Sequence, residues 1–306
     1  MRVAIIGRTE ILFEAAHKLR ELGHEVALFI TTKEAPEYTK TSADFKALAE
    51  EWKVPFIHTA QILETLDAVR ALSPIDIGVS LNYSGVIPQA VIDLFPLGIL
   101  NAHGGDLPRY RGNACQAWAI LNAEERVGLC IHRMIGGELD SGDIVAREYF
   151  PLSLDTKVTA VYAWMGARIP SLFAQAIAQL AQDPLFCIAQ QSKNPLDSLR
   201  CYPRRPSDGR IDWAQKDKAV QRLINACNKP YAGAFCEFEG EPVIIWDAEL
   251  AAPENFLAVP GQVTEIADGH VEVACGSGKL RLRQVEYRGQ VVAPDSFLRS
   301  LRLRLN

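Results

Sequence analysis

The sequence predicts an α/β fold with a doubly wound, mostly parallel sheet, followed by a small β-barrel. In the N-terminal half, short apolar strands alternate with helices of about 10–15 residues, which is typical of a parallel sheet covered by helices on both faces. From Ser207 onward, short strands follow one another between turns, and this pattern indicates a small barrel, most simply an OB-like one. With 306 residues, the chain has room for two domains of typical size.

The predicted sheet begins at the N-terminus. The apolar strand Arg2–Ile6 and the amphipathic helix Ile11–Leu22 are followed by a second strand, His24–Ile30, which completes a βαβ unit. Gly7 stands alone after the first strand, so the glycine fingerprint of a dinucleotide-binding fold is absent. The same alternation continues through the segments Ser42–Trp52, Val54–His58, Ala60–Leu72, Ile75–Leu81, Pro88–Phe95 and Leu97–Leu100.

Two domains and a linker are predicted. Residues 1–185 form the α/β domain, which ends in a long helix, Thr156–Gln182, interrupted near Pro170. Residues 186–206 are rich in Pro, Ser, Gln and Asn and form the linker. Residues 207–306 form the barrel domain, with hairpin turns at Gly240-Glu241 and Asp268-Gly269. The remaining predicted elements are Ala114–Asn122, Val127–Met134, Ile144–Pro151, Lys218–Cys227, Gly233–Glu239, Pro242–Leu250, Gly261–Ala267, His270–Cys275 and Lys279–Val285.

Composition indicates an ordinary globular protein of the cytoplasm. The net charge is −5, so a surface that binds a polyanion would have to be a local patch. No apolar run approaches the length of a membrane span, and the N-terminus enters a strand at once, without the cleavage region of a signal peptide. The seven cysteines show no CxxC spacing, which favours reduced thiols over disulfides and argues against a metal site.

The residues with the clearest chemical potential follow the strand Leu97–Leu100. His103 lies where the strand gives way to glycines, and a histidine is the natural acid or base near neutral pH. Asn101 projects from the same side of an extended chain, and an amide donor beside an imidazole can stabilise a developing oxyanion. His132 lies inside a predicted strand, and we expect it to be structural.

A second loop, Gly136–Ile144, supplies a candidate carboxylate. Asp140 lies among glycines, and it could orient His103 and stabilise its charged form, or accept a proton from an incoming nucleophile. Asp143 fits a turn residue better, and Asp106 a loop or substrate-facing group. No serine elbow accompanies the histidine, so a covalent mechanism has little support.

Three motifs stand out in these segments: Asn101-x-His103, Leu107–Gly112 and Asp140–Ile144. Together they resemble the signature of 10-formyltetrahydrofolate-dependent formyltransferases, a family that includes sugar N-formyltransferases and methionyl-tRNA formyltransferase. The resemblance extends to Asp208–Trp213 and Pro230–Phe235, so it covers almost the whole chain. It implies a Rossmann-like catalytic domain, an OB-like C-terminal domain and N10-formyltetrahydrofolate as co-substrate.

The resemblance also assigns roles to individual residues. It implies a catalytic triad of Asn101, His103 and Asp140. The segment Asn82–Pro88 resembles the family's folate pocket, and the residues implied there are Tyr83, Ser84, Val86, Ile87 and, from the later loop, Leu107. The residues expected to contact the acceptor substrate are Arg8, Arg109, Tyr110 and Arg111. The chain departs from its relatives at Asn113–Gln116, where they often have an Ala-Pro step, so the acceptor side of the site is the least defined.

Charge distribution argues for a small acceptor. A protein that binds tRNA through its phosphates needs a basic surface. The segment Thr31–Lys40 has two Lys and two Glu, and the C-terminal domain has 12 Lys and Arg against 14 Asp and Glu. Gly7–Glu10 also resembles the sugar enzymes. We therefore expect transfer of the formyl group to the amine of a nucleotide-linked amino sugar, as in lipopolysaccharide or O-antigen biosynthesis. We expect neither nucleic acid nor a membrane as a partner, and a homodimer is left open. The alternatives are a methionyl-tRNA formyltransferase, which the basic tail favours, and a catalytically silent folate- or nucleotide-binding protein.

Overall fold

The computed structural model describes residues 1–36 and 38–306, which divide into two compact units. Neither unit is one continuous stretch of chain. The sequence predicts one continuous segment for each domain, residues 1–185 and 207–306, whereas each unit of the structure is built from three separate segments. The N-terminal unit consists of Met1–Gly112, Gly128–Phe150 and Ala163–Cys201, and the C-terminal unit of Asn113–Val127, Pro151–Tyr162 and Tyr202–Asn306.

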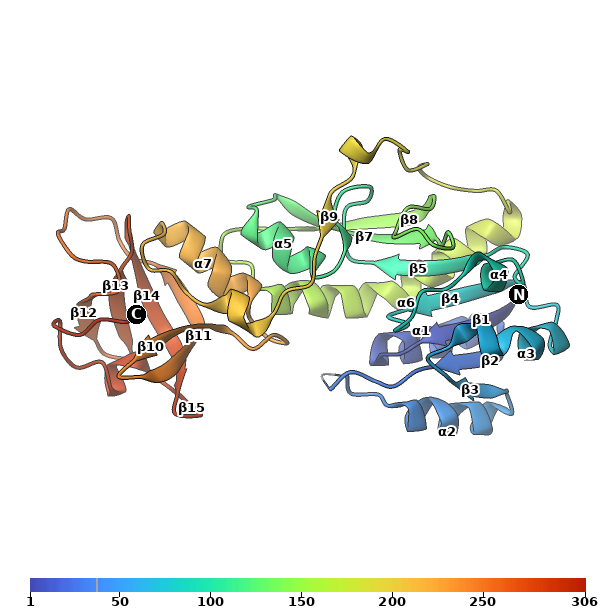
Figure 1. Cartoon of the computed structure of the whole chain (residues 1–306), viewed down its shortest axis with the longest axis horizontal. Helices are drawn as coiled ribbons and strands as arrows, with labels where there is room; N and C mark the ends of the chain where they lie inside the picture. The colour runs from blue at the N-terminus through green and yellow to red at the C-terminus, as the bar shows by residue number, and fades with distance from the viewer. Residues whose placement is uncertain (37) are drawn as a thin grey trace. The chain divides into compact units, whose positions relative to one another are not determined.

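The described part of the N-terminal unit contains a seven-stranded sheet with the order β3-β2-β1-β4-β5-β7-β8 (Figure 1). The pairs among β1 to β5 are parallel, and β7 pairs antiparallel with β5. The predicted doubly wound, mostly parallel sheet is therefore confirmed. Its strands are β1 (Arg2–Gly7), β2 (Glu25–Thr31), β3 (Phe56–His58), β4 (Ile77–Leu81), β5 (Ile99–His103), β7 (Arg126–Arg133) and β8 (Ile144–Pro151).

Helices cover both faces of this sheet. On one face, α3 and α4 pack against apolar residues of β1 and β2, among them Ile6 and Ile30. On the other face, α2 contributes Phe45, whose ring centroid lies 6.1 Å from that of Phe29 in β2. The carboxyl ends of β1 to β5 share one edge, where sheets of this kind bind their ligands. The helical segments are α1 (Glu10–Glu21), α2 (Ser42–Trp52), η1 (Ile62–Thr65), α3 (Leu66–Ala71), α4 (Gln89–Ile92) and α6 (Val158–Gln182).

The helix α6 runs without interruption through Pro170, so the predicted break is wrong. A proline inside a helix removes one hydrogen bond and costs about 3 kcal/mol or more. Burying an apolar side chain contributes about 1.5–3 kcal/mol, and α6 buries a whole stripe that includes Val161, Ile169, Phe173 and Ile177. Packing therefore outweighs the lost bond. No helix within the described residues has the length and apolar character needed to cross a bilayer.

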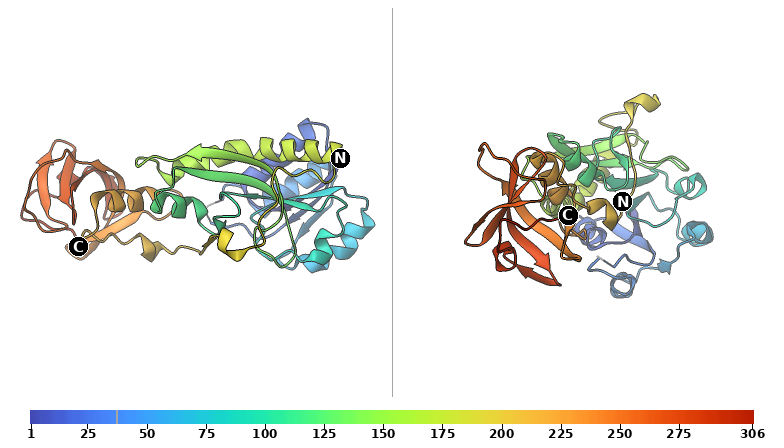
Figure 2. Two further views of the ribbon diagram at one scale, coloured as in Figure 1. Left: turned by 90° about the horizontal axis from the view of Figure 1, so that it is seen from above. Right: turned by 60° about the vertical axis from the view of Figure 1, so that its left-hand side comes forward.

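The described C-terminal unit contains a six-stranded antiparallel sheet, with the order β10-β11-β14-β13-β12 and β15 beside β14. Figure 2 shows this sheet, coloured orange to red, from two further sides. The end of the chain joins its two edge strands, since Glu237 and Asn306 exchange main-chain hydrogen bonds and the N–H of Val263 donates to Leu303. This agrees with the small barrel that the sequence predicts. Its elements are β10 (Ala234–Phe238), β11 (Glu241–Leu250), β12 (Val263–Ala267), β13 (His270–Ala274), β14 (Lys279–Tyr287), β15 (Gln290–Val292), α5 (Cys115–Leu121), α7 (Asp217–Ala226), η3 (Pro206–Gly209) and η4 (Pro294–Ser296).

Two-residue turns set the register of this sheet. The hairpin predicted at Gly240-Glu241 lies one residue earlier, because Glu239 and Gly240 have positive φ values of 53° and 80°, as a tight hairpin turn requires. Arg288-Gly289 forms another such turn and leads into β15, a strand absent from the sequence prediction. The turn at Asp268-Gly269 joins β12 to β13 as predicted.

The segment predicted as the linker contacts the N-terminal unit. Within it, β9 (Arg200–Cys201) pairs in parallel with β6 (Arg111–Gly112), and η2 (Pro195–Asp197) precedes this strand. Further back, the N–H of Ile144 donates to the carbonyl of Ala189 at 2.9 Å. Residues up to Cys201 therefore belong to the N-terminal unit, while linker limits at residues 186 and 206 stay a prediction.

Candidate active site

The strand β5 carries two of the predicted catalytic side chains. Asn101 and His103 are two residues apart on an extended chain, so they project from the same face of the sheet. Asn101 lies opposite Ser80 of β4 on one side and opposite His132 of β7 on the other. The strand ends at His103, so this residue lies at the ligand-binding edge of the sheet.

The carboxylate of Asp140 lies near two histidines. Its Oδ2 is 3.5 Å from Nδ1 of His103, and its Oδ1 is 3.5 Å from Nε2 of His132. The main-chain N–H of Gly112 donates a hydrogen bond of 2.9 Å to the same Oδ2. Asp140 has a φ of 47°, a left-handed conformation that a residue other than glycine adopts only at a cost. The contacts of this loop must therefore hold it in place.

The His103 ring is buried between two acceptors. Its Nε2 lies 2.6 Å from the carbonyl oxygen of Tyr110, so Nε2 carries a hydrogen and donates it, while Nδ1 faces Asp140. A Cβ added at Gly105 would lie 2.2 Å from that oxygen and 2.7 Å from Nε2, so only glycine fits there. Burial lowers the pKa of His103 below its ordinary value, although Asp140 and the Tyr110 carbonyl oppose the effect. The resting ring is neutral at pH 7, and Asp140 can accept the second N–H when the ring gains a proton.

The protonation of Asp140 indicates its role. Burial alone would raise the pKa of this carboxyl, but the positive charge of protonated His103 and the hydrogen bond from the N–H of Gly112 hold the pKa well below its usual range. The group is therefore an ionised, weakly basic carboxylate at neutral pH. Of the two roles that the sequence leaves open, orienting and neutralising His103 fits this state better than removing a proton from a nucleophile.

His132, expected from the sequence to be structural, lies in this cluster. Its ring is only 2% exposed, and Nδ1 donates to the carbonyl of Arg133 at 2.9 Å, which leaves Nε2 as an acceptor. The amide nitrogen of Asn101 lies 3.3 Å from that Nε2. His132 therefore orients Asn101. This contact results from the antiparallel register of β5 and β7, and one sequence alone does not reveal how these two strands pair.

Asp106 belongs to a different network. Its Oδ1 accepts a hydrogen bond of 3.1 Å from the hydroxyl of Tyr149 and lies 3.8 Å from Nη1 of Arg147. Arg147 also donates to the carbonyl of Leu107 at 2.6 Å. These contacts hold the loop after β5, so Asp106 supports the site rather than competing with Asp140.

The residues predicted for the folate pocket differ in exposure. Ile87 and Leu107 are buried in separate apolar clusters, whereas Val86 is 76% exposed. The hydroxyl of Tyr83 donates to the carbonyl of Thr59, and that of Ser84 lies 2.8 Å from the hydroxyl of Thr32. Val86 is thus the apolar side chain of this segment that can meet a ligand directly, while Ile87 and Leu107 would shape the pocket from beneath.

A cavity of about 370 Å³ opens beyond the ends of β1 to β4. Arg8 lies in it and is oriented by donating from Nε to the carbonyl of Asn82 and from Nη1 to that of Lys33. Arg8 and Lys33 outnumber the single carboxylate of the lining, Glu34. The other lining residues are Thr32, His58, Thr59, Ala60 and Ser84. A mostly cationic cavity with hydroxyl groups suits an anionic ligand.

The other predicted substrate contacts follow the loop after β5. The guanidinium of Arg109 lies 5.3 Å from the centre of the Tyr110 ring, and that ring is buried. Arg111 donates from Nη2 and Nε to the side-chain oxygen of Gln191, at 2.7 and 3.3 Å. Arg111 is thus bound to the protein itself.

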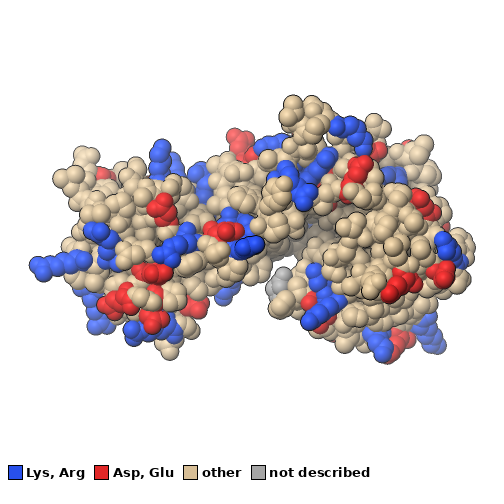
Figure 3. Space-filling model, in the orientation of Figure 1, with Lys and Arg blue, Asp and Glu red and all other residues tan. Residues whose placement is uncertain are grey.

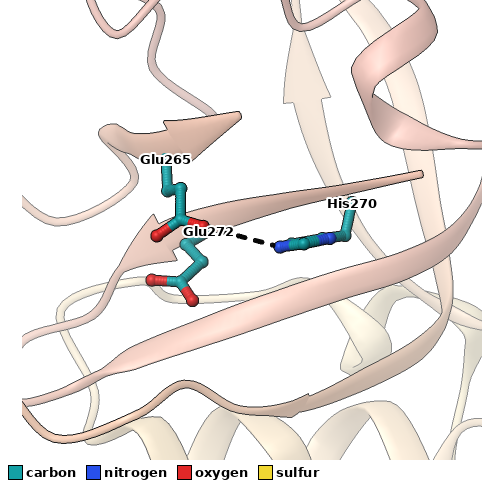
Figure 4. A group of neighbouring side chains, drawn as sticks. All are labelled: Glu265, His270 and Glu272. Atoms are coloured by element: carbon teal, nitrogen blue, oxygen red, sulfur yellow. Dashed lines mark ion pairs between the residues drawn. The ribbon is translucent and has the colours of Figure 1, made fainter. Parts of the chain in front are cut away.

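One histidine–carboxylate group among the described residues has ligand atoms close enough for a metal ion: Glu265, His270 and Glu272, on the hairpin of β12 and β13 (Figure 4). Glu272, however, lies 2.6 Å from Nζ of Lys279 and 2.8 Å from Nη2 of Arg281. Two cations already neutralise it, and a divalent metal would have to displace them. The group is better explained as part of an ion-pair network across the sheet.

Curated relatives match this chain over nearly its full length. It is 26% identical to the methionyl-tRNA formyltransferase of Citrifermentans bemidjiense, over 99% of this chain and 95% of that protein. It is 30% identical to the methionyl-tRNA formyltransferase of Solibacter usitatus, over 96% of this chain and 93% of that protein.

Solved structures share the fold. HypX from Aquifex aeolicus, in complex with tetrahydrofolic acid, matches with a TM-score of 0.64 and 19% identity over 97% of this chain, which spans only 46% of that longer chain. An N-formyltransferase from Helicobacter canadensis, in complex with folinic acid and dTDP-3-aminofucose, matches with a TM-score of 0.68 and 16% identity, over 92% of this chain and 98% of that one.

The two halves of the chain match two family models in the expected order. Residues 1–177, which include the whole Asn101–His103–Asp140 cluster, match the model described as "Formyl transferase". Residues 204–302, which include all strands of the antiparallel sheet from β10 to β15, match "Formyl transferase, C-terminal domain". With the cluster at the edge of the parallel sheet and both models in place, the chain belongs to the formyltransferase family.

Proposed function

We propose that this enzyme transfers the formyl group of N10-formyltetrahydrofolate to the amine of a nucleotide-linked amino sugar. The observation that carries the catalytic part is the cluster at the end of β5, where Asp140 pairs with His103 and Asn101 lies on the same face of the strand. An amide donor beside a histidine that can gain a charge is what acyl transfer to an amine needs.

In the mechanism, the neutral amine of the acceptor attacks the formyl carbon. The carbonyl oxygen gains negative charge, which the side-chain N–H of Asn101 and the imidazolium form of His103 stabilise. Asp140 balances the charge of that imidazolium, because its own lowered pKa keeps it ionised. His103, neutral at rest, becomes the imidazolium by taking up the proton that the amine nitrogen loses after its attack. The tetrahedral adduct then collapses as this proton passes to N10 of the folate, which leaves, and His103 is neutral again. Asp140 and His132 keep His103 and Asn101 oriented throughout.

The formyl donor follows from the family and its solved members. HypX was solved with tetrahydrofolic acid and the Helicobacter canadensis enzyme with folinic acid. In this chain the segment around Tyr83, with the exposed Val86, is the proposed contact for the pterin and its linker. Burial of the Val86 side chain under a ligand would contribute about 1.5–3 kcal/mol of favourable free energy to binding.

The acceptor assignment depends on charge. The cavity with Arg8 and Lys33 would bind the diphosphate of a nucleotide, because two cations and several hydroxyl groups face it. On the face in Figure 3, Lys and Arg are interspersed with Asp and Glu, which is unlike a surface that tracks a nucleic acid backbone. Thr31–Lys40 has two Lys and two Glu, of which Glu37 lies outside the described residues.

Methionyl-tRNA formyltransferase is the second candidate. It is favoured by the curated relatives, which carry this name and align along the whole chain. The sequence also favours this candidate through the basic tail with Arg299, Arg302 and Arg304, but the structure weakens that argument. The tail closes the C-terminal sheet through main-chain bonds of Leu303, Leu305 and Asn306, so it has a structural task.

One assay separates the candidates. The enzyme is incubated with N10-formyltetrahydrofolate and a panel of nucleotide-linked amino sugars, or with methionyl initiator tRNA, and release of tetrahydrofolate is measured. Release with an amino sugar, weakly dependent on salt, supports the proposal. Release only with the charged tRNA, falling steeply with salt, supports the second candidate. Binding of the donor without release for any amine would contradict both and leave a silent binding protein. A cytoplasmic location and a homodimer stay predictions.

A further inference from the structure

Gln191 makes an unusually complete set of contacts beside the candidate site. It is 5% exposed and lies on the segment that follows α6. Its Nε2 donates to the carbonyl of Asp140 at 2.8 Å and to that of Gly142 at 2.7 Å. Its Oε1 accepts from Nη2 and Nε of Arg111. Both hydrogens and the oxygen of its amide are therefore used.

These contacts connect Asp140 to the strand β6 by two routes. The N–H of Gly112 binds the carboxylate of Asp140, and the neighbouring Arg111 reaches the main chain of Asp140 through Gln191. Asp140 needs such support, because its φ of 47° is unfavourable for a residue with a side chain. A Cβ at Gly142 would lie 2.0 Å from the carbonyl of Arg133, so the loop also has little room to shift.

We propose that Gln191 is a positioning residue, which holds the Asp140 loop so that the carboxylate faces His103 and His132. This inference rests on the proposed function, in which Asp140 supports His103 during formyl transfer. The amide acts on the reaction only through Asp140, since its hydrogens bind the main chain of that loop. Loss of the amide would let Asp140 relax from its left-handed conformation and away from the ring.

Two substitutions distinguish the contacts of the Gln191 amide nitrogen from those of its oxygen. Gln191→Met keeps the length of the side chain but can neither donate to the loop nor accept from Arg111. Gln191→Glu keeps an acceptor for Arg111 but places an oxygen against the carbonyls of Asp140 and Gly142. Gln190→Met is the matched control, because Gln190 is the neighbouring residue and is exposed. Thermal unfolding of each variant first establishes that it is folded.

The first readout needs no acceptor. The histidine ring nitrogens are labelled with 15N, and the titration of His103 is followed by NMR. Because the charge of Asp140 raises the pKa of His103, we expect its midpoint to move to lower pH in Gln191→Met and to stay in place in Gln190→Met. An unchanged midpoint in a folded Gln191→Met would overturn the proposal, since Asp140 would then face His103 without the amide.

The second readout is kinetic. With the acceptor found in the assay above, Gln191→Met and Gln191→Glu should each lower kcat about tenfold or more, with the KM for the formyl donor nearly unchanged. A Gln191→Glu variant with full kcat would overturn the proposal, because the contact with Arg111 would then be the one that matters.

A double-mutant cycle with Asp140→Asn distinguishes this inference from the function on which it rests. If Gln191 acts through Asp140, then Gln191→Met lowers kcat no further in the Asp140→Asn background. Full activity of Asp140→Asn alone would contradict the proposed function. Loss of activity in Asp140→Asn, with normal activity in Gln191→Met, would contradict only the inference about Gln191.

Discussion

The amide nitrogen of Asn101 lies 3.3 Å from Nε2 of His132, a residue on the strand paired antiparallel with its own. Nδ1 of His132 is occupied by the carbonyl of Arg133, so its Nε2 is directed at Asn101 as an acceptor. One N–H of the Asn101 amide is thereby fixed, and the direction of the other follows from it. A donor that is oriented before the reaction stabilises a developing charge without the cost of reorganisation.

We expect His132→Phe, which keeps a ring but removes both nitrogens, to lower kcat about tenfold with little change in the KM for the folate. The reason is that the Asn101 amide becomes free to rotate. Steady-state kinetics of His132→Phe, Asn101→Ala and the double variant provide the check. Effects that simply add in the double variant would show that His132 does not act through Asn101.

The buried ring of His103 predicts a pH dependence of stability. The pKa of His103 is lower in the folded state than in the unfolded chain. Between the folded-state pKa and about 6.5 the unfolded chain therefore binds more protons, and the free energy of unfolding decreases as the pH is lowered through this window. The free energy of unfolding, measured by urea titration between pH 7 and pH 5, should therefore fall more steeply for the wild type than for His103→Gln. Equal slopes for the two proteins would contradict this prediction.

The ionised Asp140 adds a second dependence at lower pH. Its folded-state pKa is also lowered, so its contribution to stability is present above about pH 4 and is lost as the pH falls toward the folded pKa. Above pH 5, Asp140 does not change how the free energy of unfolding depends on pH. The contributions of His103 and Asp140 can therefore be separated by the pH range over which unfolding is measured.

Gly105→Ala should greatly reduce activity. The added Cβ would lie 2.2 Å from the carbonyl oxygen of Tyr110 and would separate that oxygen from His103. Gly240→Ala is the control, because nothing lies within 4 Å of a Cβ added at Gly240, and only its positive φ of 80° disfavours a side chain there. The control should lose about 1 kcal/mol of stability and keep its activity. Equal turnover in the two folded variants would be incompatible with a role for the Tyr110 contact.

Arg8→Met should raise the KM for the acceptor about tenfold or more, with kcat and the KM for the folate nearly unchanged, because a charge-assisted bond is worth about 1.5–3 kcal/mol. Arg70→Met is a suitable control, since Arg70 is exposed and pairs with Asp67. Kinetics at varied acceptor concentration measure the effect. A normal KM for the acceptor in Arg8→Met would remove Arg8 and its cavity from the substrate site.

Local pattern carries much of this fold. The central strands β1, β4 and β5 of the N-terminal sheet bury nearly every side chain, so their apolar runs are visible in the sequence, and Asn101 and His103 stand out because they interrupt such a run. The break predicted at Pro170 fails for a related reason. Proline has a local cost, but the burial that outweighs it comes from a tertiary contact.

The parts of the site that escape prediction depend on pairing between distant segments. His132 reaches Asn101 only because β7 inserts beside β5 in a particular register. Gln191 lies in a polar stretch with the composition of a linker, and only the folded chain brings its amide to Asp140, 51 residues away in sequence. Such contacts have no periodic signal, so one sequence alone does not reveal them.

The most direct test of the account is the release of tetrahydrofolate from N10-formyltetrahydrofolate that depends on an added amine. We expect the wild type to release it with a nucleotide-linked amino sugar, and Asn101→Ala and His103→Ala to be slower by about 10²–10³, as expected when one oxyanion donor is lost. Both variants should still bind the folate. Near-normal release by folded His103→Ala would contradict the account.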